Sequence, residues 1–234
     1  MVSRSTERSN EQPGPPSTVL FDLDGTLLDT APDFITCLNA QRERQNLPGL
    51  PPDMIRRSVS NGARAMVKLG FGLEPGHADY ERTHGEFLDH YEAHLAVDSC
   101  LFPGMDALLS WLEARAIPWG IVTNKPERFT GPLLKGLELA HRCAVTICPD
   151  HVTNRKPHPE SLLLAADRLG VDPRKGIYVG DHLRDIQAGR EAGMFTVAAR
   201  YGYIEEPEKL AEWQADLIVD DAAALLQWLQ SRNA

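Results

Sequence analysis

The chain has few cysteines, no long apolar run and no surplus of positive charge. Its four cysteines include no C-x-x-C pair, which argues against a zinc site or a redox pair. No apolar stretch is long enough to cross a membrane, and no signal-peptide pattern precedes the first apolar run. Basic residues number 24 against 33 acidic ones, and no basic stripe appears, which argues against a nucleic-acid partner. We therefore expect a cytoplasmic protein.

Beyond these absences, the composition is that of an ordinary globular protein. Hydrophobic residues make up 42% of the 234 residues and charged residues 24%. Residues 1–17 are polar, with several prolines near their end, and we predict a disordered tail there. The remaining length suits one large domain, or a core domain with a small insertion.

Short apolar runs alternate with amphipathic segments of helical length over most of the chain. The apolar runs are continuous, which is typical of parallel strands buried on both faces. We predict strands over residues 18–23, 119–123, 144–148, 176–180, 195–199 and 216–219. We predict helices over residues 105–115, 127–137, 160–169, 184–192 and 222–232. This alternation predicts an α/β fold with a doubly wound parallel sheet.

No convincing strand occurs between about residue 31 and residue 100. Helices are predicted there over residues 33–46, 52–58, 63–69 and 80–95, with Thr30 as the cap of the first. A helical insertion directly after the first strand lies above the carboxyl end of the sheet, where open α/β sheets bind ligands. We predict a catalytic core formed by residues 18–30 and 101–234, and a helical cap domain formed by residues 31–100.

Polar side chains gather at the ends of the predicted strands. Two carboxylates two residues apart share one face of a continued strand, and they repel each other unless a cation or a proton intervenes. A hard divalent ion with oxygen ligands, typically Mg²⁺, usually neutralises such a pair. In chain order the strand-end segments are Asp22-Leu23-Asp24-Gly25-Thr26, Thr123-Asn124-Lys125, Lys156 ahead of a helix, and Asp181 with Asp185.

These four segments resemble the four motifs of the haloacid dehalogenase (HAD) superfamily, and the chain from residue 19 to residue 229 is similar to its phosphatases. The resemblance implies a Rossmann-like core with a helical cap inserted after the first strand. By position, Asp22 resembles the nucleophile that forms an aspartyl-phosphate, and Asp24 resembles the general acid/base. Thr123 resembles the hydroxyl that hydrogen-bonds the transferring phosphoryl group, and Lys156 resembles the conserved lysine.

The resemblance also implies a Mg²⁺ site and favours phosphate esters as substrates. Asp22, the main-chain carbonyl of Asp24, Asp181 and Asp185 would hold the ion. Asn124 would position the phosphate through its backbone. The acid at position 24 favours phosphate esters, because the dehalogenases and phosphonatases of the superfamily lack an acid there.

The cap is expected to select the substrate. Arg64 lies in Asn61-Gly62-Ala63-Arg64, where it can clamp a carboxylate or can be a surface residue of an amphipathic helix. The chain is similar to the phosphoglycolate phosphatase branch. Its segments 62–67, 123–126, 147–152 and 200–204 are closer still to the N-acetylmuramic acid 6-phosphate phosphatases of bacterial cell-wall recycling. Both substrates carry a carboxylate besides the phosphate.

We therefore expect a Mg²⁺-dependent phosphomonoesterase acting on a small carboxylate-bearing phosphate, as a monomer or weak homodimer. N-acetylmuramic acid 6-phosphate is the favoured substrate and 2-phosphoglycolate the alternative. A phosphosugar mutase of the same superfamily and an inactive sugar-phosphate-binding module stay open as other functions.

Four histidines lie outside these roles. His90 and His94 can share a helix face, but no third zinc ligand is evident, which favours a solvated cap helix. His182 stands where many members of the superfamily have a small residue or Asp. His158 receives no role.

Overall fold

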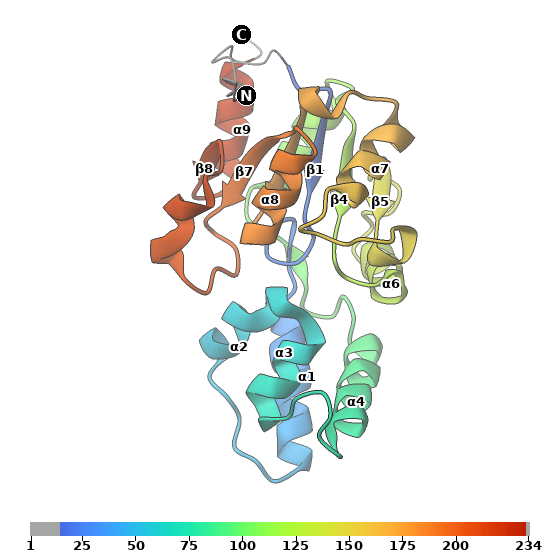
Figure 1. Cartoon of the computed structure of the whole chain (residues 1–234), viewed down its shortest axis with the longest axis vertical. Helices are drawn as coiled ribbons and strands as arrows, with labels where there is room; N and C mark the ends of the chain where they lie inside the picture. The colour runs from blue at the N-terminus through green and yellow to red at the C-terminus, as the bar shows by residue number, and fades with distance from the viewer. Residues whose placement is uncertain (1–14, 233–234) are drawn as a thin grey trace, which may run out of the picture.

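The computed structural model describes residues 15–232, over which strands and helices alternate (Figure 1). The strands are β1 (Thr18–Phe21), β2 (Leu28–Asp29), β3 (Cys100–Leu101), β4 (Trp119–Val122), β5 (Val145–Ile147), β6 (Gly176–Gly180), β7 (Phe195–Ala199) and β8 (Leu217–Val219). The helices are α1 (Ala31–Arg44), α2 (Pro52–Ser58), α3 (Gly62–Phe71), α4 (Tyr80–Ala93), α5 (Met105–Glu113), α6 (Glu127–Gly136), α7 (Glu160–Leu169), α8 (Leu183–Glu191) and α9 (Ala222–Ser231).

Most of the predicted tail, residues 1–14, lies outside the described residues. Its last residue, Ser17, donates a backbone hydrogen bond of 2.9 Å to the carbonyl of Lys175. No helix of residues 15–232 is long and apolar enough to span a membrane.

The strands β5, β4, β1, β6, β7 and β8 form one sheet in this order, and every pairing in it is parallel. The predicted α/β fold with a parallel sheet is therefore confirmed. Strand β1 lies between β4 and β6, with Phe21 opposite Ile121 on one side and Val179 on the other. The chain leaves β1 towards β4 and β5 and later returns to its other side, so β1 borders the point where the winding reverses.

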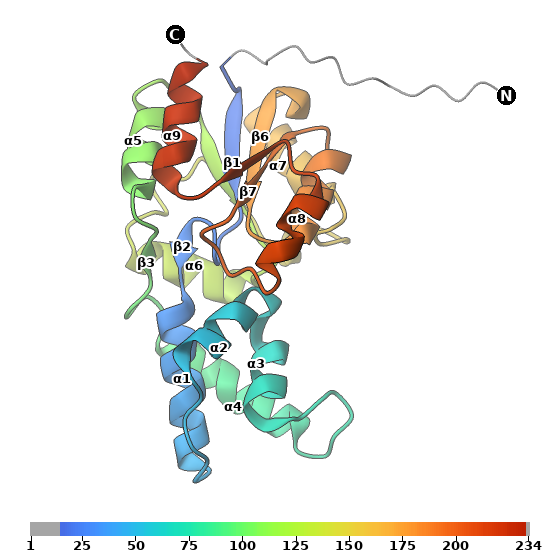
Figure 2. The ribbon, with the colours of Figure 1, turned by 90° about the vertical axis from the view of Figure 1, so that its left-hand side faces the viewer.

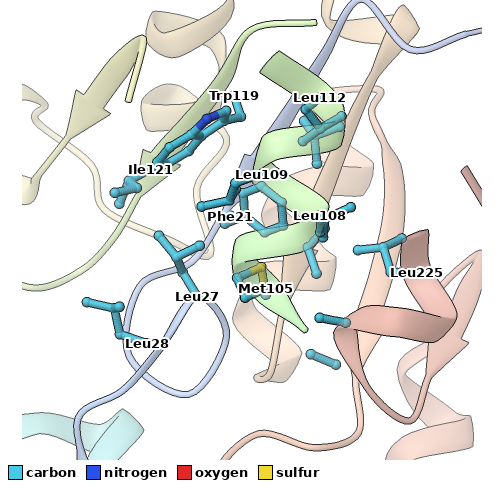
Figure 3. Close-up of a cluster of buried hydrophobic side chains, with 14 of the residues drawn as sticks. Phe21, Leu27, Leu28, Met105, Leu108, Leu109, Leu112, Trp119, Ile121 and Leu225 are labelled. Carbon is cyan, nitrogen blue, oxygen red and sulfur yellow. The ribbon is translucent and has the colours of Figure 1, made fainter. Parts of the chain in front are cut away.

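Alternate residues of β1 face two helical layers (Figure 2). Val19 and Phe21 belong to the hydrophobic cluster that α5 and α9 cover, whereas Leu20 belongs to the cluster that α7 and α8 cover. Figure 3 shows the first cluster, where Leu108, Leu109 and Leu112 of α5 pack near Phe21 and Trp119. Burial on both faces explains why the strands are continuously apolar.

Helices α1–α4 form a separate unit beyond the carboxyl end of the sheet (Figure 1). Their shared core is aromatic, with the rings of Phe34 and Tyr91 only 4.2 Å apart between centroids. Strands β2 and β3 pair antiparallel at the junction between the two parts. This ribbon was not predicted, because two residues are too few to show a strand pattern.

Thr30 precedes α1 as predicted, but it does not cap the helix with its side chain. Its hydroxyl instead donates a hydrogen bond of 2.6 Å to Asp24 Oδ1. The prediction of a side-chain cap was therefore wrong, because a carboxylate brought close by the fold competes successfully with the amides of the first helical turn.

Candidate active site

The register of the sheet brings polar residues of three strand ends to one edge. Asp22, Thr123 and Asp181 each directly follow β1, β4 or β6 in the chain. The backbone N–H of Asp22 donates to Val179 O at 2.8 Å, and that of Thr123 donates to Ile147 O at 3.0 Å. The ladder thus continues to the first polar residue of these loops, which fixes where their side chains begin.

A glycine allows the loop after β1 to lie against the end of β6. Gly25 has a φ of +81°, and a Cβ at this position would collide with the Asp181 carboxylate. Glycine alone adopts this conformation without strain and leaves room for the neighbouring side chain. The D-x-D-G order of the motif is therefore a steric requirement of the site.

Lys156 joins two of the predicted acidic residues. Its ammonium lies 2.9 Å from Asp22 Oδ1 and 2.8 Å from Asp185 Oδ1, and all three side chains are buried. It also donates to the carbonyl of Val122 and to the Tyr178 hydroxyl, at 2.9 and 2.7 Å. Four oxygen acceptors around a buried ammonium offset its loss of hydration.

Asp22, Asp181 and Asp185 form a compact group of buried carboxylates. One oxygen from each lies within 4.8 Å of the others. Burial raises the pKa of Asp22, although Lys156 opposes the change. Burial, reinforced by the charges of Asp22 and Asp185, raises the pKa of Asp181 to about 7. Burial is the main cause of both shifts, and the neighbouring carboxylates add to it.

This group suits a hard divalent cation. Its donors are carboxylate oxygens only, which is the ligand chemistry of Mg²⁺. Asp22 Oδ1 accepts hydrogen bonds from Lys156 and from the N–H of Leu23, and neither of these contacts uses its other oxygen. The raised pKa values of Asp22 and Asp181 show that a further positive charge would be stabilising here.

Asp24 lies beside this group but has different partners. Its Oδ1 accepts from the Lys125 ammonium at 2.9 Å and from Thr30 at 2.6 Å. Lys125 received no role from sequence, although it stands in the strand-end segment Thr123-Asn124-Lys125. Nothing in its spacing indicated a contact with a residue 101 positions earlier in the chain.

A cavity of about 500 Å³ opens over these residues, between the sheet edge and the helices α1–α4. The core contributes Asp22, Asp24, Thr123, Asn124, Lys125 and Lys156 to its lining, and the helical unit contributes Phe34, Ser60, Arg64, His84 and Tyr91. Of the eight predicted site residues, six line this cavity, including Arg64. The remaining two, Asp181 and Asp185, are fully buried beneath it.

The side chains of Thr123 and Asn124 also join the loops around the cavity. Thr123 Oγ1 accepts from the N–H of Lys125 at 3.0 Å, which leaves its own hydroxyl proton to donate. The Asn124 amide donates to the carbonyl of Lys156 at 3.0 Å and so ties the loop after β4 to the loop before α7.

Ser60 and Arg184 link the helical unit to the acidic group, and neither was singled out from sequence. Ser60 Oγ donates to Asp181 Oδ2 at 3.0 Å, and the same oxygen accepts from the N–H of Tyr203 at 2.8 Å. The Arg184 guanidinium donates to the carbonyl of Ser60 at 2.5 Å. Ser60 lies in a loop between helices and Arg184 lies in the core. No local sequence pattern predicts a contact between two such positions.

His158 and His182 make local structural contacts at the starts of helices. His182 precedes α8 and its Nδ1 accepts from the N–H of Arg184, while burial lowers its pKa to about 4. His158 Nδ1 accepts from the N–H of Glu160 at the start of α7. The rings of His90 and His94 are 6.2 Å apart, and among the described residues they belong to no common group of possible metal ligands.

Comparison with known proteins relates the chain to one family of hydrolases and to phosphatases. Residues 19–199 match the family model described as haloacid dehalogenase-like hydrolase. An N-acetylmuramic acid 6-phosphate phosphatase from Pseudomonas aeruginosa is 49% identical over 90% of this chain and 93% of its own length. A phosphoglycolate phosphatase from Xanthomonas campestris pv. campestris is 45% identical over 90% of this chain and 95% of its own.

A solved structure shows the same fold. The crystal structure of a predicted phosphoglycolate phosphatase from Haemophilus somnus superposes with a TM-score of 0.80 at 27% identity. The match covers 92% of this chain and 98% of that one.

Proposed function

Because the chain belongs to the haloacid dehalogenase-like hydrolase family, we propose that it is a Mg²⁺-dependent phosphatase that works through an aspartyl-phosphate. Its favoured substrate is N-acetylmuramic acid 6-phosphate, the compound named for the Pseudomonas aeruginosa relative. We further propose that residues 31–100 act as a cap, the name used below for the unit of helices α1–α4.

One observation supports this proposal above the others. A single buried ammonium, that of Lys156, contacts both Asp22 and Asp185 at the floor of a cavity that Asp24 and Thr123 also line. A nucleophile, a proton donor and a phosphoryl-binding hydroxyl thus lie within one enclosed space. A protein that only binds a sugar phosphate has no need of a carboxylate beside a second carboxylate.

The contacts of Asp22 hold its carboxylate in one orientation. Lys156 and the N–H of Leu23 both contact Oδ1 and so fix the side chain that we propose attacks phosphorus. As the Asp22–phosphorus bond forms, the bond from phosphorus to the ester oxygen breaks, and Asp24 donates a proton to the departing alcohol. The Thr123 hydroxyl donates to a phosphoryl oxygen as charge develops there.

Hydrolysis of the intermediate uses the same residues in reverse. Asp24, now deprotonated, accepts a proton from water while the water oxygen attacks phosphorus, which releases phosphate and restores Asp22. Asp22, the carbonyl of Asp24, Asp181 and Asp185 would hold a Mg²⁺ ion, which would supply the positive charge that lets a carboxylate approach a phosphate dianion. The cap limits the access of other molecules to this space.

The size and charge of the cavity support a substrate larger than phosphoglycolate. A volume of about 500 Å³ lies within the range of pockets that enclose drug-sized ligands. Arg64, Arg128 and Arg155 line it and offer positive charge to a carboxylate. We expect a phosphosugar acid, the larger molecule, to make more contacts in this space than phosphoglycolate.

The test is phosphate release from a panel containing N-acetylmuramic acid 6-phosphate, 2-phosphoglycolate and hexose phosphates, with Mg²⁺ or with chelator. We expect Mg²⁺-dependent release, greatest for the muramic acid derivative. Asp22→Asn should lower kcat by more than about 10³-fold because the nucleophile is lost. Asp167→Asn on the exposed face of α7 is the matched control.

Other outcomes would contradict the proposal in distinguishable ways. Full turnover in chelator would exclude the metal, and near wild-type activity of Asp22→Asn would exclude the covalent intermediate. Turnover that requires a bisphosphate activator would identify a mutase. Tight sugar-phosphate binding without any hydrolysis would identify a binding module.

A further inference from the structure

Each of the two aspartates of the D-x-D motif has a buried lysine of its own. Lys156 contacts Asp22, and its remaining partners, Asp185, Val122 O and the Tyr178 hydroxyl, all belong to the core and none to the cap. Lys125 contacts Asp24, and its side chain is only 5% exposed. The two lysines therefore occupy similar electrostatic positions but differ in what surrounds them.

The surroundings of Lys125 come from the cap. Its ammonium donates to the Tyr91 hydroxyl of α4 at 2.7 Å. It also lies 4.7 Å from the centroid of the Tyr91 ring and 5.1 Å from that of Phe34 on α1, within the range of cation–π attraction. A buried ammonium is unfavourable unless such groups replace its lost water. The position of Lys125 thus depends on α1 and α4 lying over the site.

Lys125 also determines how Asp24 presents its carboxylate. Lys125 and Thr30 both contact Oδ1, and neither uses Oδ2. Two contacts on one oxygen fix the plane of the carboxyl group and reserve the other oxygen for proton transfer. General acid catalysis requires this fixed placement of the donor, since a misplaced group transfers its proton inefficiently.

We propose that Lys125 is a positioning residue for Asp24 and that Tyr91 of the cap completes its surroundings, so that the acid/base carboxyl is held in its working orientation while the cap covers the site. The inference rests on the proposed function, because it assumes that Asp24 protonates the leaving alcohol. Lys125 acts through Asp24 and needs no contact with the reacting atoms.

This role predicts a dependence on the leaving group. An alkyl alcohol leaves only when protonated, whereas p-nitrophenol leaves as a stable anion and needs little help from an acid. The value of kcat/KM reports the steps up to transfer of the phosphoryl group to Asp22. Loss of Lys125 should therefore lower kcat/KM for an alkyl phosphate much more than for p-nitrophenyl phosphate.

The experiment compares both kinds of substrate in the full-length protein, using the alkyl phosphate that the wild type hydrolyses best. Lys125→Met should lower kcat/KM for this ester by about 100-fold, and for p-nitrophenyl phosphate by less than about threefold. Lys125→Arg should restore part of the alkyl activity, since it keeps the charge. Lys68→Met, which removes an exposed cap lysine paired with Glu74, should change neither value.

Tyr91→Phe tests the cap contact separately and removes only one hydroxyl. It should lower kcat/KM for the alkyl ester by about 10-fold with the same preference for the aryl ester, and its melting temperature should verify that it folds. Equal losses on both substrates, or no loss in Lys125→Met and Tyr91→Phe, would overturn the inference. A wild type that hydrolyses no phosphomonoester would instead refute the proposed function.

Discussion

Asp22 and Asp24 are two residues apart, yet their surroundings differ. Asp22 is buried, and one of its oxygens is held by Lys156 at the centre of the acidic group. Asp24 is partly exposed to the cavity and is held by Lys125 and Thr30. Different environments for two neighbouring carboxyl groups are what a nucleophile and a proton donor require.

Asp24→Asn removes the proton donor while keeping the size and shape of the side chain. We expect kcat for an alkyl phosphate to fall by about 10²–10⁴-fold, because an amide can neither protonate the alcohol nor activate water. Steady-state phosphate release measures this, with circular dichroism to verify folding. An unchanged rate would remove Asp24 from the mechanism.

The raised pKa of Asp181, about 7, predicts how metal-free protein responds to pH. Because the folded-state pKa lies above the unfolded value of 3.8, the contribution of this group to stability is full below that value. It is lost as pH rises through about 7. We therefore expect a cation bound at this group to contribute more to stability as pH increases.

Mg²⁺ should accordingly raise the melting temperature more at about pH 8 than at about pH 5.5, since it binds the deprotonated carboxylates and protons compete with it. In Asp181→Asn, Mg²⁺ should raise the melting temperature little at either pH. Thermal melts of both proteins with Mg²⁺ or with chelator measure this. An equal increase in melting temperature at the two pH values in the wild type would contradict the raised pKa of Asp181.

At the scale of elements, contacts from the cap reach the residues of the site. The ribbon of β2 and β3 lies at the junction, and the contacts come from near α3 and from α4. Ser60, just before α3, donates to Asp181, while Tyr91 of α4 accepts from Lys125. The helical unit therefore contacts both the acidic group and Lys125, the partner of the proposed acid/base residue Asp24. Arg64 of α3 lines the same cavity but is exposed, as a residue that meets the substrate should be.

Arg64→Ala tests this placement of α3. We expect KM for a carboxylate-bearing substrate to rise roughly 10–100-fold, the value of one charge-assisted hydrogen bond, while KM for p-nitrophenyl phosphate changes little. Arg57→Ala on α2 is the matched control, because Arg57 is exposed and does not line the cavity. Equal changes in KM for both substrates would show that Arg64 does not contact the carboxylate of the substrate.

At the scale of the whole molecule, separate hydrophobic clusters stabilise the sheet and the helical unit. The cluster around Phe21 and Leu109 joins the sheet to α5 and α9, whereas the aromatic cluster around Phe34 and Tyr91 holds α1–α4 together. Phe34 and Tyr91 of the aromatic cluster line the cavity between the two parts, whereas Phe21 and Leu109 do not. We therefore expect substitutions in the cluster around Leu109 to change stability without changing catalysis.

Leu109→Ala should lower the free energy of unfolding by about 2–5 kcal/mol, because it leaves a cavity in a fully buried cluster away from the site. KM should stay at the wild-type value. Leu163→Ala, on the exposed face of α7, should change stability by less than about 0.5 kcal/mol. Urea unfolding measures both, and a loss of under about 1 kcal/mol for Leu109→Ala would show that the cluster relaxes around the change.

The sequence alone determined the α/β class and the acidic and basic residues at the strand ends, because these depend on local periodicity. Continuous apolar runs mark buried parallel strands whatever their neighbours, and the polar residues that end them share one edge of the sheet. The order of the strands, the junction ribbon and the true partner of Thr30 did not follow from any such pattern.

Tertiary structure alone decided which groups meet across the cavity. Lys125 contacts Asp24 from a position 101 residues later, and Tyr91 reaches the same ammonium from a helix of the cap. Such contacts depend on how two separately packed parts sit against each other. Side-chain periodicity carries no information about that arrangement, because it describes only which face of an element is buried.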